Sequence, residues 1–308
     1  MNYTIKNDLK ISKMTLGTVQ LGMSYGVNNA SGMPTEQKSF EILDAAHEGG
    51  VTFLDTSDDY GKSEEVIGKY LKSNPDKKFN ICTKFNVKDV DNADVYKTLK
   101  DFVLKSCKKL CIDSIPIFMS HSENNYIQYG KYLTDALKEL KNEGLIGCSA
   151  ISMSRKDDLD KIIDCGGFDA IQLPLNILDN KAITSGQVKR MSDSGMAVFV
   201  RSVYLQGLFF RKIEQLEGTK LERAIPYINK VNEIAKSENI SVAQLALSYI
   251  RDTVGVDSLV VGSETPEQVK QNIEMFNTPT LSVDLINYIN EQFKEVDPFV
   301  ISPWEWNK

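Results

Sequence analysis

The chain has 308 residues and a formal net charge of −6, with 42% hydrophobic and 25% charged side chains. These fractions are those of a globular protein with a sizeable core. The acidic balance argues against nucleic-acid binding and against anchoring to an anionic membrane. No apolar run reaches membrane-spanning length, and the first eight residues lack the apolar centre of a signal peptide. Five cysteines without a Cys-x-x-Cys pair indicate reduced thiols, so we expect a cytoplasmic protein.

The chain opens with a predicted hairpin over residues 2–13, in which two short apolar runs flank the turn-forming trio Lys6-Asn7-Asp8. From Met14 onward, short β-like runs alternate with amphipathic helical runs. The predicted strands cover 14–16, 51–54, 79–83, 114–119, 146–149, 170–173, 197–200 and 258–261. The predicted helices cover 35–48, 63–72, 94–111, 127–143, 155–165, 183–194, 221–251 with a break near Asn239, and 266–276, followed by a further helix after Leu281.

Eight repeats of strand and helix are typical of an all-parallel sheet with helices outside it. The length suits a (β/α)8 TIM barrel, which usually has about 250 residues before insertions. A doubly wound open sheet is the alternative. It is less favoured because the glycine spacing over 16–22 does not match the Gly-x-Gly-x-x-Gly dinucleotide fingerprint. No linker or low-complexity stretch interrupts the pattern, so we expect a single domain over 1–308.

Polar residues follow three successive predicted strands. Asp55 ends the second strand and Tyr60 lies in the loop after it, while Lys84 ends the third strand and His121 follows the fourth. Each has an ordinary structural explanation, such as a capping carboxylate or an emerging lysine. Because the carboxyl ends of barrel strands share one rim, their joint occurrence favours a catalytic site there. Only two histidines are present, a count that excludes a histidine-rich metal site, and we predict no metal.

The segments around these residues resemble the aldo-keto reductases, and the resemblance extends over essentially the full length of the chain. It is carried by Leu16-Gly17-Thr18, Asp55-Thr56-Ser57-Asp58-Asp59-Tyr60-Gly61-Lys62-Ser63-Glu64, Thr83-Lys84 and Ser120-His121. The resemblance implies a (β/α)8 barrel closed at its base by the N-terminal β-hairpin. It also implies a nicotinamide cofactor bound extended across the rim and reduction of an aldehyde or ketone, possibly a sugar, to the alcohol.

The chemistry of carbonyl reduction agrees with these four residues. Hydride adds to the carbon while the oxygen gains a proton, so an acid must meet the developing oxyanion. Tyr60 is the predicted donor, although an unperturbed phenol has a pKa near ~10. A nearby ammonium from Lys84 is expected to lower that pKa. Asp55 is the predicted counter-charge of Lys84, and His121 is predicted to orient the carbonyl oxygen.

The resemblance also implies a set of cofactor-binding residues. Ser149 and Gln172 are expected to hold the nicotinamide carboxamide, and Ala150 replaces the asparagine that commonly follows the serine. Arg201 stands where many members place an aromatic ring under the nicotinamide, and its charge would disfavour the oxidised, positively charged ring. The full predicted set is Gly17, Thr18, Val19, Asp55, Ser149, Gln172, Arg201, Ser202, Leu205, Gly207, Gly262, Ser263, Gln268 and Asn272.

The cofactor preference depends on the segment over 262–272. A helix is predicted to start at Thr265 with a capping box, and its free N–H groups suit a cofactor phosphate. Gln268 and Asn272 are one turn apart and are expected to bracket the adenine. The family default is NADP(H), usually with a basic side chain against the 2′-phosphate. Here Glu264 and Gln268 take that place, so NAD(H) is an open alternative.

The predicted substrate is a small-molecule carbonyl compound. Its expected contacts are Tyr25, Phe85, His121 and Tyr204, and the sequence assigns neither the compound nor an oligomeric state. One alternative function is a cofactor-binding regulatory or scaffold subunit, as in the β subunits of potassium channels. Another is an aldolase that forms a Schiff base on Lys84. The aldolase is less favoured because it leaves Asp55 and Tyr60 without roles.

Overall fold

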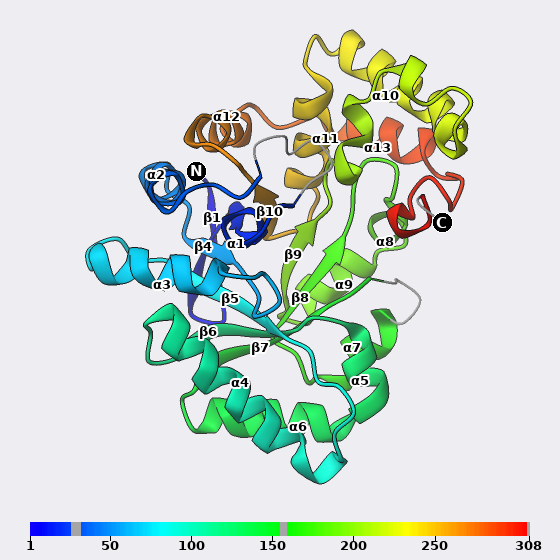
Figure 1. Ribbon diagram of the computed structural model, residues 1–308. Helices are drawn as coiled ribbons and strands as arrows, with labels where there is room; N and C mark the ends of the chain where they lie inside the picture. The colour runs from blue at the N-terminus through cyan, green and yellow to red at the C-terminus, as the bar shows by residue number, and fades with distance from the viewer. Residues whose placement is uncertain (26–31, 155–158, 307–308) are drawn as a thin grey trace.

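Eight parallel strands close into a barrel with helices around it (Figure 1). The structure is a computed structural model that describes residues 1–25, 32–154 and 159–306. The strand order is β10-β3-β4-β5-β6-β7-β8-β9, so consecutive strands are neighbours and the first pairs with the last. This confirms the predicted (β/α)8 barrel. The barrel strands are β3 (Met14–Gly17), β4 (Phe53–Asp55), β5 (Asn80–Phe85), β6 (Ile115–Ser120), β7 (Ile146–Ser152), β8 (Ala170–Pro174), β9 (Ala197–Arg201) and β10 (Ser258–Gly262).

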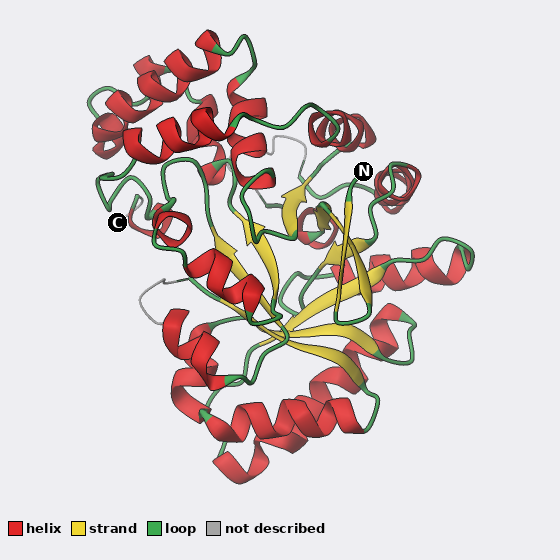
Figure 2. Ribbon diagram, turned by 180° about the vertical axis from the view of Figure 1, so that it is seen from behind, coloured by secondary structure: helices red, strands yellow, loops and turns green. Residues whose placement is uncertain are grey.

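Helices surround the barrel in Figure 2, where they appear outside the yellow strands. The α-helices are α1 (Val19–Gly22), α2 (Glu36–Glu48), α3 (Ser63–Ser73), α4 (Val95–Leu110), α5 (Glu123–Tyr129), α6 (Lys131–Asn142), α7 (Leu159–Cys165), α8 (Lys181–Thr184), α9 (Gln187–Asp193), α10 (Ile225–Ser237), α11 (Val242–Arg251), α12 (Pro266–Phe276) and α13 (Val283–Gln292). Short 3-10 helices are η1 (Asn92–Asp94), η2 (Leu205–Phe210), η3 (Ile213–Gln215), η4 (Lys220–Ala224) and η5 (Pro303–Glu305). The first four residues of the helix predicted over 155–165 lie outside the described residues. None of the described helices combines the length and hydropathy that a membrane crossing needs.

Two predicted helices are each two helices in the structure. The helix predicted over 127–143 is divided at Gly130, which has a φ of 49°. The helix predicted over 183–194 is divided before Gly186, which has a φ of 80°. A residue in the left-handed region cannot continue a right-handed helix, and glycine adopts that region at little cost. The break predicted near Asn239 is confirmed, since its φ of 56° separates α10 from α11.

The N-terminal hairpin closes the base of the barrel, as expected. Strands β1 (Tyr3–Lys6) and β2 (Leu9–Ser12) pair antiparallel. Ile11 is fully buried in the cluster of side chains that fills the barrel. Lys6 Nζ lies 3.0 Å from Asp257 Oδ2, just before the start of β10. The hairpin therefore covers the end of the barrel opposite the carboxyl ends of the strands.

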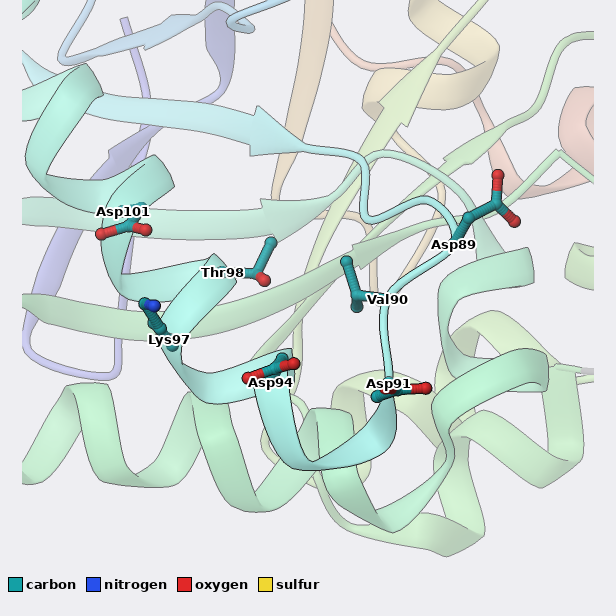
Figure 3. A pocket seen from close by; sticks show the side chains of 7 residues that line it. All are labelled: Asp89, Val90, Asp91, Asp94, Lys97, Thr98 and Asp101. Atoms are coloured by element: carbon teal, nitrogen blue, oxygen red, sulfur yellow. The ribbon is translucent and has the colours of Figure 1, made fainter.

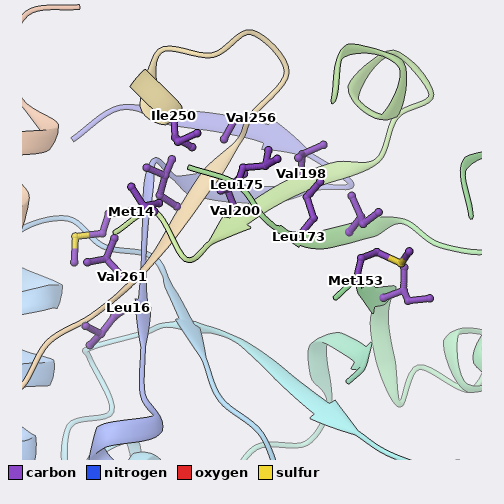
Figure 4. Close-up of a cluster of buried hydrophobic side chains, with 14 of the residues drawn as sticks. Met14, Leu16, Met153, Leu173, Leu175, Val198, Val200, Ile250, Val256 and Val261 are labelled. Atoms are coloured by element: carbon purple, nitrogen blue, oxygen red, sulfur yellow. The ribbon is translucent and has the colours of Figure 1, made fainter. Parts of the chain in front are cut away.

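The core has two parts that follow from the two-residue period of a strand. In β9, Ala197 and Phe199 belong to the cluster inside the barrel. Val198 and Val200 alternate with them and belong to the larger cluster between the barrel and its helices, part of which is drawn in Figure 4. The same alternation decides which residues at the carboxyl ends of the strands face the mouth of the barrel, where the predicted site lies.

Candidate active site

A buried ion pair lies at the carboxyl ends of β4 and β5. Lys84 Nζ is 2.6 Å from Asp55 Oδ1 and donates to the carbonyl oxygen of Thr56 at 2.9 Å. Only 2% of Lys84 and 4% of Asp55 is exposed. Burial is the largest single effect and favours the neutral amine, but the charge and hydrogen bond of Asp55, together with Tyr60 and Cys82, outweigh it and raise the pKa of Lys84 above its ordinary value. Lys84 therefore stays an ammonium at neutral pH, and Gln172 Nε2 donates to the second oxygen of Asp55 at 2.7 Å.

Tyr60 lies over this pair. Its ring centroid is 5.0 Å from Lys84 Nζ, and its backbone N–H donates to the carbonyl of Ser57 in the loop after β4. Burial raises the pKa of the phenol, Lys84 lowers it and Asp55 raises it, and the net result is a raised pKa. Lys84 lowers the pKa of Tyr60, as predicted, but burial outweighs the ammonium, so the net pKa is higher than the sequence alone suggests. Tyr60 holds its proton at neutral pH, which is the form that a proton donor needs.

His121 completes the group. Its backbone N–H donates to the carbonyl of Phe85, and its ring meets the Tyr60 ring edge-on with centroids 5.8 Å apart. Its Nδ1 lies 3.2 Å from Asp59 Oδ2 and 3.4 Å from Ser57 Oγ. Burial and Lys84 lower the pKa of His121, against the opposing effect of Asp59. The structure thus brings all four predicted catalytic residues together on one side of the barrel mouth.

A pocket of about 620 Å³ lies beside this group, between the carboxyl ends of β3, β9 and β10. Asp55, Tyr60 and Gln172 form its wall on the catalytic side. Of the other predicted residues it is lined by Gly17, Thr18, Val19, Tyr25, Arg201, Ser202, Tyr204, Gly207 and Gly262. Seven other lining residues were not in the predicted set, namely Gln20, Val203, Gln206, Phe210, Val260, Val261 and Glu264. Only their position in the sequence could have identified them, since most of them follow the ends of β3, β9 or β10.

Ser149 lies elsewhere, and the prediction that it faces the cofactor is wrong. Its hydroxyl lies 2.9 Å from Asp169 Oδ2 and 3.1 Å from the carbonyl oxygen of Gly167. Cys148 and Ala150, on either side of it, belong to the interior cluster, so Ser149 points away from the barrel interior. Ser152 has the inward parity and pairs in register with Gln172 on β8. Ser152 is therefore the β7 serine beside Gln172.

Six further predicted contacts also do not line the pocket, namely Phe85, His121, Leu205, Ser263, Gln268 and Asn272. Phe85 is 1% exposed and packs on the ring of Phe118 at 4.4 Å, between the barrel and α4, so it is not placed to touch a substrate. It follows Lys84 by one residue, and neighbouring residues of a strand face opposite sides. Leu205 is buried in the outer core and does not line the pocket.

The segment from the end of β9 into the first residues of η2 has an unusual backbone. Ser202, Leu205 and Gln206 have φ angles of 63°, 45° and 52°, in the left-handed region that side chains other than glycine rarely occupy. Such residues tend to gather where a loop holds a ligand. Arg201 precedes the loop, and its guanidinium contacts Met153 O at 3.1 Å and Ser202 Oγ at 3.3 Å. Within the described part of the chain it forms no ion pair, although burial lowers its pKa.

In the segment after β10, predicted cofactor-binding side chains form hydrogen bonds with other residues of the same segment. Asn272 Nδ2 donates to Ser263 Oγ at 3.1 Å, and both residues are buried outside the pocket. Thr265 caps α12, as predicted. The expected capping box is not formed. It would require Gln268 Oε1 to accept from the backbone N–H of Thr265, whereas this atom accepts from the backbone N–H of Glu264 at 2.7 Å. Glu264 itself reaches the pocket wall.

A second pocket of about 460 Å³ lies between the end of β5 and α4, away from this site (Figure 3). It is lined by Asp89, Val90, Asp91, Asp94, Lys97, Thr98 and Asp101. In Figure 3 the carboxylates of Asp89 and Asp101 lie on opposite sides of it. Nowhere in the described residues do three or more histidine, cysteine or acidic side chains converge as metal ligands do. We assign no site to this pocket.

Comparison with known proteins agrees with the geometry at the first pocket. Residues 13–293 match the model of the aldo/keto reductase family. The NADH-specific methylglyoxal reductase of Escherichia coli K12 is 25% identical over 301 residues, which cover 88% of this chain and 91% of that protein.

Among solved structures, an aldo-keto reductase from Bacillus halodurans in its holo form has a TM-score of 0.75 at 22% identity, covering 96% of this chain and 100% of that one. The glycerol dehydrogenase of Gluconobacter oxydans has a TM-score of 0.74 at 18% identity, covering 94% and 95%. At these identities the two structures establish a shared fold.

Proposed function

The chain belongs to the aldo/keto reductase family, and from this premise we propose that it is a nicotinamide-dependent oxidoreductase that reduces an aldehyde or ketone to the alcohol. The observation that carries the proposal is the buried ammonium of Lys84 beneath the ring of Tyr60, held by Asp55. A solvent-shielded ammonium under a phenol stabilises negative charge on that phenol, and Lys84 acts on the pKa of Tyr60 in this direction, against burial and Asp55. A site of this kind serves a reaction in which the phenol gives up its proton.

In the proposed reaction, Tyr60 donates the phenolic proton to the oxygen of the substrate as that oxygen gains negative charge. The bound nicotinamide supplies the hydride that the carbonyl carbon receives. The phenolate left on Tyr60 is stabilised by Lys84, whose positive charge is retained because Asp55 lies 2.6 Å away. Gln172 fixes the second oxygen of Asp55 and so limits the pair to one geometry. His121, beside Tyr60, contacts the same substrate oxygen.

The pocket fits a polar cofactor. Tyr204 Oη and Gln20 Oε1 are buried and lack a hydrogen-bond partner among the described residues, although both side chains belong to the wall of the pocket. Buried polar atoms normally have partners, so an occupant that supplies them is favoured. Ser152 and Gln172 are the proposed ligands of the carboxamide, with Arg201 and Ser202 beside the ring.

We further propose that NAD(H) is preferred to NADP(H). Glu264 lines the pocket, and Arg201, at the catalytic end, is the single cationic side chain among the described lining residues. A carboxylate repels a 2′-phosphate and accepts hydrogen bonds from a ribose hydroxyl. The name of the Escherichia coli relative, which is NADH-specific, supports the same preference. The family default of NADP(H) predicts the opposite result when kcat/KM is measured with each reduced cofactor.

Turnover by a Tyr60→Phe variant tests the catalytic proposal. We expect the variant to bind cofactor as tightly as the parent and to lose roughly 10²–10⁴-fold in kcat, the usual contribution of a positioned acid. Methylglyoxal and a panel of sugars and aromatic aldehydes are suitable substrates, with cofactor absorbance as the readout. Reduction at the parental rate would contradict the role of Tyr60. Tight cofactor binding by the parent without turnover on any carbonyl would favour the regulatory alternative.

A further inference from the structure

We propose that Asp59 is a positioning residue that keeps the proton of neutral His121 on Nδ1. Nε2 then presents a lone pair to an alcohol, and it presents a hydrogen to a carbonyl only when the ring is doubly protonated. The proposal rests on the function proposed above, in which His121 contacts the substrate oxygen. Its basis is the 3.2 Å contact between His121 Nδ1 and Asp59 Oδ2.

The contact selects one tautomer because of the chemistry of its two atoms. An ionised carboxylate has acceptor sites and no hydrogen to donate. A contact of 3.2 Å with Nδ1 is therefore favourable when Nδ1 carries a hydrogen, and repulsive when Nδ1 carries a lone pair. In a neutral imidazole only one nitrogen is protonated, so Nε2 is then the acceptor.

The loop holds Asp59 in the position that this contact requires. The backbone N–H of Asp59 donates to Ser57 Oγ at 3.1 Å, which fixes the turn between them. The backbone N–H of Tyr60, the next residue, donates to the carbonyl oxygen of Ser57 at 3.0 Å. Asp59 therefore belongs to the same short turn as the proposed proton donor.

One competing arrangement exists within the same turn. Ser57 Oγ lies 3.4 Å from Nδ1 and has a hydrogen of its own. If that hydrogen pointed at Nδ1, the proton of the ring would be on Nε2. The ring then would donate to a carbonyl without an added proton. The two arrangements differ in which ring nitrogen is protonated, and that property is measurable.

The charges around His121 come from three elements. Asp59 and the phenol of Tyr60 face it from the loop after β4, Asp55 from the end of β4, and Lys84 from β5. Lys84 opposes a second proton on the ring, while Asp59 and Asp55 favour it. Asp55 is already paired with Lys84. Asp59 lies outside that buried pair and is the carboxylate that contacts His121 directly.

Nitrogen-15 NMR of the ring nitrogens tests the tautomer directly. The chain has only two histidines, and His47, on α2 beside Phe79, is an internal reference. In the neutral parent we expect His121 to be protonated on Nδ1. Asp59→Asn offers both an acceptor and a donor, so it should weaken the preference for this tautomer, and Asp59→Ala should shift the tautomer toward Nε2. Protonation of Nε2 in the parent, or an unchanged tautomer in Asp59→Ala, would overturn the proposal.

Kinetics test the consequence for the reaction. If reduction needs the doubly protonated ring, kcat/KM for the carbonyl should fall as pH rises through the pKa of His121. Removing the charge in Asp59→Asn should move that fall to lower pH and raise the carbonyl KM about twofold to fivefold at fixed pH, as suits a partly exposed pair. Cofactor affinity should not change, and Asp89→Asn is the matched control for loss of one remote charge. An unmoved pH profile would contradict this role, while the NMR result stands independently of turnover.

Discussion

The two sides of the barrel mouth differ in how far their side chains are bonded to each other. On the side of β4, β5 and β6, Asp55 is bonded to Lys84 and Gln172. On the side of β9 and β10, Tyr204 Oη is buried without a partner, and the hydrogen-bond acceptors of Arg201 are neutral oxygens; both statements apply to the described residues. The first side is organised before any ligand arrives, whereas the second retains hydrogen-bonding groups that an occupant would satisfy.

The loop that carries Tyr60 shows the same organisation. Asp58 Oδ1 lies 2.5 Å from Lys109 Nζ, and Asp58 Oδ2 lies 2.9 Å from Lys105 Nζ, both on α4. Thr83 Oγ1 donates to Glu64 Oε1 at 2.7 Å, joining β5 to the start of α3. These bonds hold the loop from two directions. The comparison therefore predicts that substitutions on the catalytic side affect stability as well as turnover, and that substitutions on the cofactor side mainly affect binding.

The largest effect should come from Lys84→Met. It leaves the Asp55 carboxylate buried without its partner, and breaking a buried ion pair from one side typically costs about 3–5 kcal/mol of unfolding free energy. Turnover should be lost with it, since the phenolate of Tyr60 loses its stabilising charge. Denaturant unfolding and kcat measure the two effects. The control is Lys105→Met, an exposed lysine on α4, which should cost less than about 1 kcal/mol.

The double variant Lys84→Met with Asp55→Asn sharpens that result. Removing both charges takes away the unpaired carboxylate, so much of the stability should return while turnover stays lost. If the double variant were as unstable as Lys84→Met alone, the cost would lie in packing instead of charge.

A smaller effect, confined to binding, should come from Arg201→Ala. A guanidinium near the nicotinamide opposes the positive charge of the oxidised ring. Its loss should therefore narrow the affinity gap between oxidised and reduced cofactor by about fivefold, an effect on the order of 1 kcal/mol. Cofactor titration with both forms measures the gap. Arg201→Lys retains the charge and should keep most of it, whereas an unchanged gap in Arg201→Ala would mean that Arg201 acts on the substrate.

The smallest effect should come from Asp58→Asn and should depend on pH. Burial raises the pKa of Asp58, but hydrogen bonds from Lys109 and Lys105 outweigh it and lower the pKa below its ordinary value. A lowered folded-state pKa gives stability above the ordinary pKa of a carboxyl, and that stability is lost as pH falls through the folded-state value. We expect the variant to be roughly 1 kcal/mol less stable at pH 7. The difference should shrink as the pH falls below the ordinary pKa of an aspartate, about 3.9, so a constant difference across that range would contradict the ion-pair explanation.

The barrel and the catalytic group could be predicted from the sequence because their signals are local and repeated. Asp55 and Lys84 each end an apolar run, and the rule that barrel strands share one rim places them side by side. The sign of the pKa shift of Tyr60 could not be predicted in this way. It depends on how completely the surrounding chain buries the phenol, which no short segment encodes.

The errors on the cofactor side come from strand register. Ser149 and Ser152 are three residues apart in one strand, so choosing the wrong one reverses the face. The apolar run gives no sign of where β7 ends, and the motif alone fits either serine. The wrong prediction for Phe85 was avoidable, because a Lys84 side chain that faces the barrel interior requires the next residue of the strand to face outward. Leu205 lies in a left-handed turn whose side-chain directions follow from backbone angles that the sequence does not state.

The pocket lies where the barrel closes, at the pairing of its first strand, β3, with its last strand, β10. Gly17 and Gly262 are partners in this register, one near the start of the chain and one near its end, and both line the pocket. A Cβ on Gly262 would lie 2.7 Å from Gln20 Nε2, so a side chain there would displace the wall. The Asp55–Lys84 pair joins neighbouring strands only 29 residues apart. A growing chain can thus contain the charge pair long before it contains a binding site, which exists only once the circle of strands is complete.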